Sequence, residues 1–137
     1  MKIAIIAPCP PPYGGISRVV ENHLAQWTTD KIEAHFVPMY APDAPKPITR
    51  ATFVDLTASD NQGSFIQSLQ HGAALAWHLP VTRPANAMRI FRYAAALENY
   101  VRKHKIDLIY AHELWPAGAI ANVVAKKTGT TSAVVAY

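Results

Sequence analysis

Two short segments of the sequence hold residue types that could do chemistry. The first is the turn Pro12-Tyr13-Gly14-Gly15-Ile16-Ser17. The second is Tyr110-Ala111-His112-Glu113-Leu114-Trp115-Pro116-Ala117-Gly118, where an apolar run ends. A glycine turn that leads into a helix can gather backbone N–H groups around an anion, and Ser17 could bind a phosphate or cap that helix. A histidine beside a carboxylate can orient a hydroxyl group or share a proton. The plainer interpretations are a structural turn and an exposed loop.

Other reactive residue types give weaker signals. The turn is not G-x-G-x-x-G and has no P-loop lysine, so it supports neither a dinucleotide site nor an NTPase. Cys9 lies among prolines without an evident partner base, which favours an inert thiol. We expect no metal site, and most remaining histidines should lie at the surface or be half-buried, because they lack ligand spacing: His23, His35, His71, His78 and His104.

The composition limits the class of protein. The 137 residues fit one domain with a real core, since 50% are hydrophobic and 16% are charged. No apolar run reaches the roughly 18–20 residues of a membrane span, and the start is too short for a secretory signal. The single cysteine permits no internal disulfide and suits a reducing compartment. The sequence therefore predicts a cytoplasmic protein.

The excess of basic residues is small, at 13 Lys+Arg against 9 Asp+Glu. A solvated helix face explains most of it, and attraction to an anionic membrane surface or to a phosphate-bearing ligand is the alternative. Nucleic acid is not expected, because aromatic residues do not interleave with the charge. Much of the basic charge falls in one stretch: Arg83, Arg89, Arg92, Arg102, Lys103 and Lys105.

Apolar periodicity predicts alternating strands and helices, and hence an α/β fold. We expect a Rossmann-like three-layer sandwich with a mostly parallel sheet, in which ligands bind at the carboxyl ends of the strands. Ser64 or Asp60 should cap the second helix, and Pro116 should lie in the first turn of the fourth, with Gly129 as its end. Strands are predicted at 2–7, 31–40, 51–56, 106–111 and 131–137, and helices at about 15–28, 61–78, 86–105 and 116–127.

The third predicted helix is the most clearly amphipathic one. Asn86 should cap it at its start, and its charged residues should face the solvent. The inner stripe is predicted to contain Ile90, Ala94, Leu97 and Val101, and the outer face Arg89, Arg92, Glu98, Asn99 and Arg102.

The end of the sequence, TSAVVAY at 131–137, has the composition of a buried strand without a polar tail. Domains seldom end inside a central strand, so we expect residues 1–137 to be a fragment of a longer domain. The sheet edge exposed in this way should promote self-association with another chain.

Two stretches resemble one family. KIAIIAPCPPPYGGISRVVENHL at 2–24 and IDLIYAHELWPAGAIA at 106–121 look like the N-terminal half of retaining glycosyltransferases of family 4, which have the GT-B fold. The resemblance covers residues 1–28 and 104–137 and leaves about 40–100 without a counterpart. It implies two Rossmann-like domains across a cleft, of which the N-terminal one mainly binds the acceptor. The C-terminal domain, which binds the nucleotide-sugar donor, is not part of these 137 residues.

The resemblance also implies roles for particular residues. Gly14 and Gly15 match the family's glycine loop near the donor diphosphate, and Ser17 follows on the same side. His112 matches a histidine that lines the acceptor side of the cleft, and Glu113 and Tyr13 are expected to bind substrate with it. The family's histidine after the fifth strand is not reached, so no catalytic residue is assigned and the chain alone should be inactive.

The implied function is part of an enzyme of polysaccharide or glycan biosynthesis. It would transfer a sugar from a nucleotide-sugar to a glycan, lipid-linked or small-molecule acceptor, at or near the inner membrane face, without any cofactor besides that co-substrate. Alternatives are a non-catalytic acceptor-binding or membrane-docking subunit of a two-polypeptide transferase, and another GT-B enzyme such as a sugar-nucleotide epimerase. A plain doubly wound binding domain of the flavodoxin type is the third.

Overall fold

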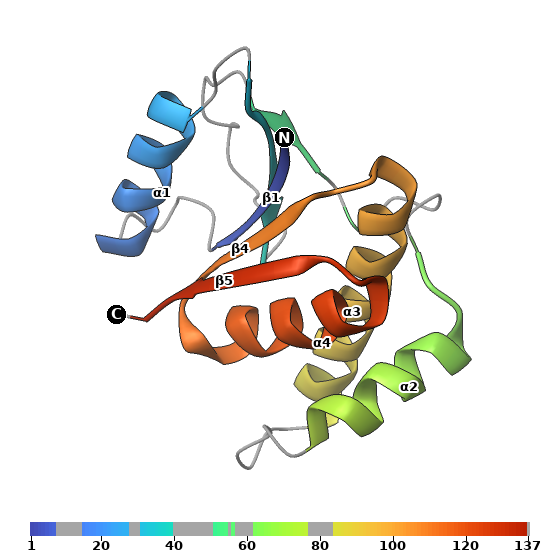
Figure 1. Cartoon of the computed structure of the whole chain (residues 1–137). Helices are drawn as coiled ribbons and strands as arrows, with labels where there is room; N and C mark the ends of the chain where they lie inside the picture. Colours follow the sequence, from blue (N-terminus) through green and yellow to red (C-terminus); the bar gives the residue numbers. More distant parts are fainter. Residues whose placement is uncertain are drawn as a thin grey trace.

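The computed structural model of the chain describes residues 1–7, 15–27, 31–39, 51–54, 56, 62–76 and 84–136, without the side chains of 15–17, 21, 27, 84 and 85. Its strands form one sheet in the order β3-β2-β1-β4-β5, and all pairs are parallel (Figure 1). The strands are β1 (Lys2–Ala7), β2 (Glu33–Pro38), β3 (Thr52–Phe53), β4 (Leu108–His112) and β5 (Thr131–Val135). The helices are α1 (Gly15–Trp27), α2 (Phe65–Leu75), α3 (Pro84–His104) and α4 (Ala119–Thr128), with a π-helical turn η2 (Leu114–Gly118) before α4.

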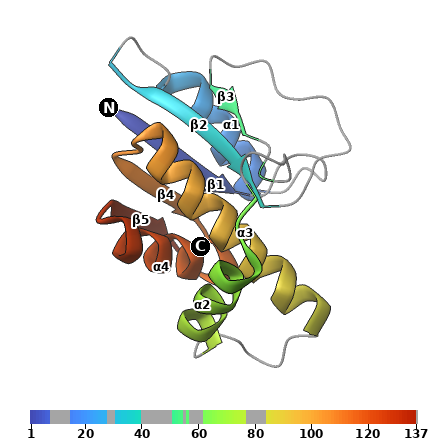
Figure 2. The same ribbon diagram turned by 90° about the vertical axis from the view of Figure 1, so that its right-hand side faces the viewer.

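Helices cover both faces of the sheet. One face packs on α1, the other packs on α3 and α4, and α2 lies outside against α3 (Figure 2). Side chains of β1 alternate between these layers, because successive residues of a strand point to opposite faces. Ile3 and Ile5 belong to the core on the α1 side, and Ala4 and Ile6 to the core on the α3 side. The predicted α/β three-layer fold is confirmed, and the described sheet is entirely parallel.

The strand order separates two kinds of doubly wound sheet. The order 3-2-1-4-5 is that of Rossmann-like domains, whereas flavodoxin-like domains have 2-1-3-4-5. The described sheet therefore has the Rossmann-like strand order and not the flavodoxin-like one. In a 3-2-1-4-5 sheet the direction of winding reverses between β1 and β4, and the crevice beyond their carboxyl ends is the usual ligand position.

Several predicted helix ends are confirmed by capping contacts. The backbone N–H of Gln67 donates to Ser64 Oγ at 3.1 Å, so Ser64 caps α2. Gly129 ends α4 with φ 72°, a left-handed conformation that glycine adopts at little cost. The prediction for Asn86 is wrong, because helix α3 begins at Pro84 and includes Asn86. Pro116 lies in the π-helical turn that continues directly into α4 at Ala119, so it does lie near the start of this helical segment.

Two expectations about burial are also wrong. Strand β5 is not a buried central strand: in the described sheet it has only β4 as a neighbour, and its residues are half-buried or exposed. Glu98 does not face the solvent but is 8% exposed, because α2 packs over this side of α3. Within the part of the chain that the structure describes, no helix has the length and apolar character needed to cross a membrane.

Candidate functional site

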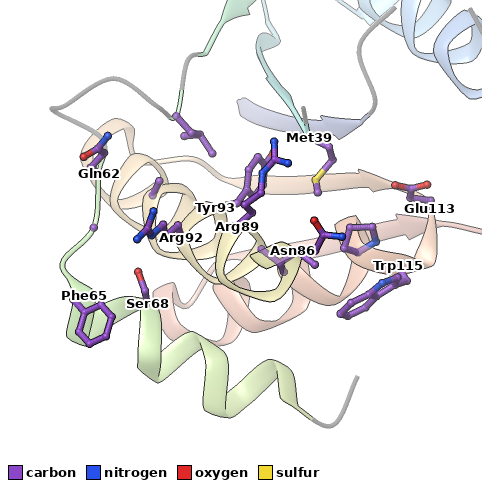
Figure 3. Close-up of a pocket in the computed structure, with 15 residues that line it drawn as sticks. Met39, Gln62, Phe65, Ser68, Asn86, Arg89, Arg92, Tyr93, Glu113 and Trp115 are labelled. Atoms are coloured by element: carbon purple, nitrogen blue, oxygen red, sulfur yellow. The ribbon is translucent and has the colours of Figure 1, made fainter. Parts of the chain in front are cut away.

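A pocket of about 970 Å³ opens at the carboxyl end of the sheet, between α3, α2 and the segment after β4 (Figure 3). Its size lies at the upper end of the ~300–1,000 Å³ that small-molecule sites usually have. Polar, charged and aromatic side chains share its wall, which suits a ligand with both ring surface and polar groups. The lining residues are Met39, Leu56, Gln62, Gly63, Phe65, Ser68, Asn86, Arg89, Ile90, Arg92, Tyr93, Ala96, Glu113, Trp115 and Pro116.

Helix α3 supplies the basic side of the pocket. It precedes β4 and runs antiparallel to the strands, so its N-terminal half lies at their carboxyl ends. Arg89 and Arg92 are three residues apart and therefore lie on one side of the helix. Tyr93 anchors this half of α3 to the sheet, since its hydroxyl donates to the carbonyl of Val37 at 3.1 Å. Figure 3 shows Arg89 beside Tyr93 and Met39, and Arg92 toward Gln62 and Ser68.

Glu113 supplies the acidic side of the pocket, and its backbone φ lies outside the range usual for L-residues. Its φ of 98° is one that L-residues rarely adopt, and such a conformation costs about 1–3 kcal/mol. Two hydrogen bonds hold it: its N–H donates to the carbonyl of Val135 at 2.9 Å, and its carbonyl accepts from the N–H of Gly118 at 3.0 Å. Burial raises the pKa of the Glu113 carboxyl group. Strain of this kind concentrates at functional sites, which makes Glu113 a candidate binding residue.

Gly118 makes this backbone arrangement feasible. A Cβ atom at Gly118 would lie 2.9 Å from the carbonyl oxygen of Glu113 and 2.8 Å from Cγ1 of Val134. Both distances are shorter than real Cβ contacts, and one partner is backbone that cannot rotate away. Glycine at this position therefore lets the π-helical turn, β5 and the Glu113 peptide pack closely together.

His112 does not share the pocket with Glu113. It is the last residue of β4 and faces α1, where it is fully buried. Its ring centroid lies 5.3 Å from that of His23 and 4.9 Å from that of Tyr110. Burial, and then the nearby His23, lower the pKa of His112 to about 4, so its ring is neutral at neutral pH. The structure thus separates the predicted His112–Glu113 pair onto opposite faces of the sheet.

The predicted glycine site is described only in part. Tyr13, Gly14 and the thiol of Cys9 lie outside the described residues. Gly15 is the first residue of α1, and Ser17 follows in the first turn, where its side chain is also outside the described set. In chain order, α1 is the element that follows the carboxyl end of β1. A role for these residues toward a diphosphate stays a prediction.

A buried polar cluster joins α2 to α3 and was missed by sequence reasoning. His71 Nε2 lies 2.6 Å from Glu98 Oε2, and Glu98 also accepts from Gln67 Nε2 at 3.0 Å and from Arg102 at 3.2 Å. Burial lowers the pKa of His71, which is fully buried. Burial acts to raise the pKa of Glu98, but these hydrogen bonds outweigh it and the pKa is lowered. Glu98 and His71 Nε2 thus have partners within the protein, whereas His71 Nδ1 is buried without a hydrogen-bond partner among the described residues. These contacts hold α2 against α3.

A second polar cluster lies at the amino end of the sheet. The ring of His35 bonds to the Tyr100 hydroxyl through Nδ1 and to Glu33 Oε1 through Nε2, the latter at 2.8 Å. His104 stacks on Tyr100 with 4.1 Å between ring centroids. Burial, and then Glu33, raise the pKa of Tyr100 to about 12. In this cluster both ring nitrogens of His35 have hydrogen-bond partners within the protein.

Trp115 and Pro116 belong to the second predicted segment and do line the pocket, whereas sequence reasoning missed the lining residues Asn86 and Tyr93 of α3. The sequence did contain a signal for Arg89 and Arg92 as pocket residues. They are two basic residues about one turn apart in the first half of a predicted amphipathic helix. Among the described residues, no group of three or more His, Cys, Asp or Glu side chains is arranged to hold a metal ion. A comparison with protein-family models and with curated proteins finds no match to this sequence.

Proposed function

We propose that this chain is the acceptor-side, N-terminal part of a retaining GT-B glycosyltransferase. The enzyme would transfer a sugar from a nucleotide-sugar to an acceptor hydroxyl group. The pocket between α2, α3 and Glu113 would hold the acceptor, and a second Rossmann-like domain would bind the donor. The start of α1 would face the donor diphosphate, where backbone N–H groups stabilise negative charge.

One observation carries this proposal: the two stretches that resemble the family are neighbours in the sheet. Ile3 to Ile6 of β1 pair with Leu108 to Ala111 of β4 in parallel register. The carboxyl ends of these strands therefore meet at the point where the winding reverses, which is where doubly wound folds bind ligands. Glu113 directly follows β4 at this point, and Gly15 begins the helix that comes after β1 in the chain.

The pocket side chains suit the work of an acceptor site. Trp115 and Phe65 offer ring surface for the apolar face of a sugar, as in most small-molecule pockets. Glu113 can accept a hydrogen bond from the attacking hydroxyl and so fix its direction, which contributes through orientation. Glu113 is assigned here as a positioning residue, because no side chain in the described part of the chain forms an ion pair with its carboxyl group.

The test is a transfer assay on the product of the whole reading frame that contains these residues. We expect that frame to encode a second Rossmann-like domain, and its product to transfer a sugar from a nucleotide-sugar with retention of anomeric configuration, measured by proton NMR. The 137-residue chain alone should give no transfer. Transfer by the chain alone, or a complete frame that encodes no donor domain, would contradict the proposal.

A matched pair of variants connects the assay to the site. Glu113→Gln should lower kcat/KM for the acceptor about tenfold or more, because the carboxylate no longer orients the hydroxyl. Glu33→Gln removes an equal charge at the other end of the sheet and should leave kcat/KM unchanged. Equal effects of the two variants would remove the reason for assigning Glu113 to the acceptor site.

A further inference from the structure

The two arginines of the pocket differ from Arg102, further along the same helix, in their hydrogen-bond partners. Arg102 bonds to Glu98 Oε1 at 3.2 Å and to the carbonyl of Lys127 at 2.7 Å. Arg89 and Arg92 form no ion pair or hydrogen bond with any residue that the structure describes, and both are exposed. Helix α3 therefore provides structural partners for one arginine and leaves two guanidinium groups open to the pocket.

The surroundings of these two arginines point to a ligand rather than to bulk solvent. Arg89 and Arg92 line a concave site together with Tyr93 and Phe65, not a convex helix surface. The Tyr93 hydroxyl already donates to Val37, so this residue offers its ring to the pocket. A guanidinium group next to apolar ring surface is suited to binding phosphate. The planar guanidinium group can donate two parallel hydrogen bonds to two phosphate oxygens.

Positively and negatively charged side chains lie on different sides of the pocket. Arg89 and Arg92 lie on α3, whereas Glu113 follows β4 and forms no ion pair with either arginine. A ligand that spans the pocket can thus place an anionic group at the arginines and a hydroxyl group at Glu113. A neutral sugar would leave both guanidinium groups without a partner.

We propose that the pocket binds a phosphate-bearing acceptor, with the phosphate at Arg89 and Arg92 and the acceptor hydroxyl at Glu113. The name acceptor rests on the proposed function, but the phosphate site does not. The phosphate has two possible sources, a soluble sugar phosphate or a lipid headgroup. Phe65 lines the pocket, and Ile66 and Leu69 are further exposed apolar side chains of the same helix α2, so this helix could accommodate the apolar part of a lipid.

The test is a titration of the chain followed by backbone amide shifts in NMR spectra. The probes are inorganic phosphate, glucose-6-phosphate and glucose. We expect glucose-6-phosphate to shift amides near Arg89, Arg92 and Glu113, and to bind at least about tenfold more tightly than glucose. Equal binding of glucose and its phosphate, or shifts confined to other parts of the chain, would overturn the phosphate site.

Variants separate the site from general attraction between charges. Arg89→Gln and Arg92→Gln together should weaken glucose-6-phosphate binding about tenfold or more, since each removes a charge-assisted hydrogen bond. Lys126→Gln removes an exposed positive charge on α4, outside the pocket, and should leave the affinity within about twofold. Equal losses in all these variants would contradict a specific site.

Vesicle sedimentation distinguishes the two sources of phosphate. Vesicles of phosphatidylcholine, with or without phosphatidylglycerol, would be incubated with the chain and with the Arg89→Gln, Arg92→Gln double variant. Binding that needs both phosphatidylglycerol and the arginines supports a lipid source, and binding of glucose-6-phosphate without vesicle binding supports a soluble one. If neither binds through the arginines, the phosphate site is wrong even if the transferase assay succeeds. If phosphate binds but no transfer occurs, the proposed function fails and the site stands.

Discussion

Both ends of the parallel sheet carry titratable side chains, but these side chains differ in whether they have partners within the protein. At the amino end, His35 bonds to Tyr100 and Glu33. At the carboxyl end, Arg89, Arg92 and Glu113 make no side-chain ion pair with any described residue and line an open pocket. Polar groups at the amino end stabilise the protein, whereas those at the carboxyl end remain available to a ligand.

The backbone conformation also differs between the two ends of the sheet. The carboxyl end contains Glu113 at φ 98°, and Gly118 must lack a side chain to allow it. The residues of the amino-end cluster, Glu33, His35, Tyr100 and His104, lie in regular strand or helix. Lys105, beside this cluster, also has a positive φ, but its 53° lies in the left-handed region that L-residues reach most easily, whereas the 98° of Glu113 lies outside it. The more strained backbone is therefore at the carboxyl end, and strain of this kind concentrates at functional sites.

Acid is predicted to have the largest effect, and to act at the carboxyl end. His112 has a pKa of about 4 in the folded chain, below the 6.5 of an unperturbed histidine, because it is buried. The stability that depends on a neutral His112 is fully present above pH 6.5. As the pH falls toward 4, the free energy of unfolding decreases by about 3 kcal/mol in total, because the unfolded chain binds a proton that the folded chain does not. Urea unfolding at several pH values should show this slope, and His112→Asn should flatten it.

His23 provides the control for this pH dependence. Burial is the larger cause of the low pKa of His112, and His23 is the smaller one. His23→Asn should therefore reduce the slope only slightly. A slope that disappears in His23→Asn, or persists unchanged in His112→Asn, would contradict the assignment.

Gly118→Ala is predicted to have the next largest effect, a loss of about 2 kcal/mol in the free energy of unfolding. The new Cβ would press on the carbonyl oxygen of Glu113 and on Val134, and overpacking of this kind costs about 1–3 kcal/mol. Because the Glu113 peptide must move, ligand binding in the pocket should weaken as well. Thermal unfolding and the NMR titration measure the two effects. Loss of stability with unchanged binding would show that Glu113 is not a pocket residue.

At the amino end, His35→Ala should lower stability and leave the pocket unaffected. The substitution removes a buried ring and leaves the Tyr100 hydroxyl without its partner, at a cost of about 1.5 kcal/mol. Urea unfolding should show the loss, and the affinity for glucose-6-phosphate should stay the same. A weaker affinity in His35→Ala would mean that the two ends are not independent.

Glu113→Gly is the smallest expected change and has the opposite sign. Glycine adopts φ 98° without the penalty of a side chain, so the free energy of unfolding should rise by about 1 kcal/mol. The same variant lacks the carboxylate and should bind acceptors less well. Glu113→Gln, which keeps the strain, should lose binding without gaining stability. A Glu113→Gly variant less stable than the parent chain would argue against stored strain.

Much of the fold could be predicted because its signals are local. The apolar run of β1, the Ser64 cap and the Gly129 stop depend on neighbours in sequence. Glu98 was misplaced because its burial depends on α2, whose contact with α3 is not visible in the helical period of either element. Charge alone suggested an exposed position, but partners from another helix made burial feasible.

The candidate site was harder to predict, because it is assembled from distant elements. His112 and Glu113 were expected to act together, since they are adjacent and were placed in one loop. Strand β4 instead continues through His112, and the two side chains face different layers. Met39 and Arg89 reach Glu113 only through the pairing order of the sheet and the docking of α3, which no local pattern encodes.

The most direct test of the difference between the two ends is the map of amide shifts produced by glucose-6-phosphate on the 137-residue chain. The account predicts shifts around 86–93 and 113–118, at the carboxyl end, and none around 33–35 and 100–107, at the amino end. Shifts centred on the amino end, or none in the pocket at concentrations that saturate other phosphate-binding proteins, would contradict the claim that the carboxyl end is the ligand site.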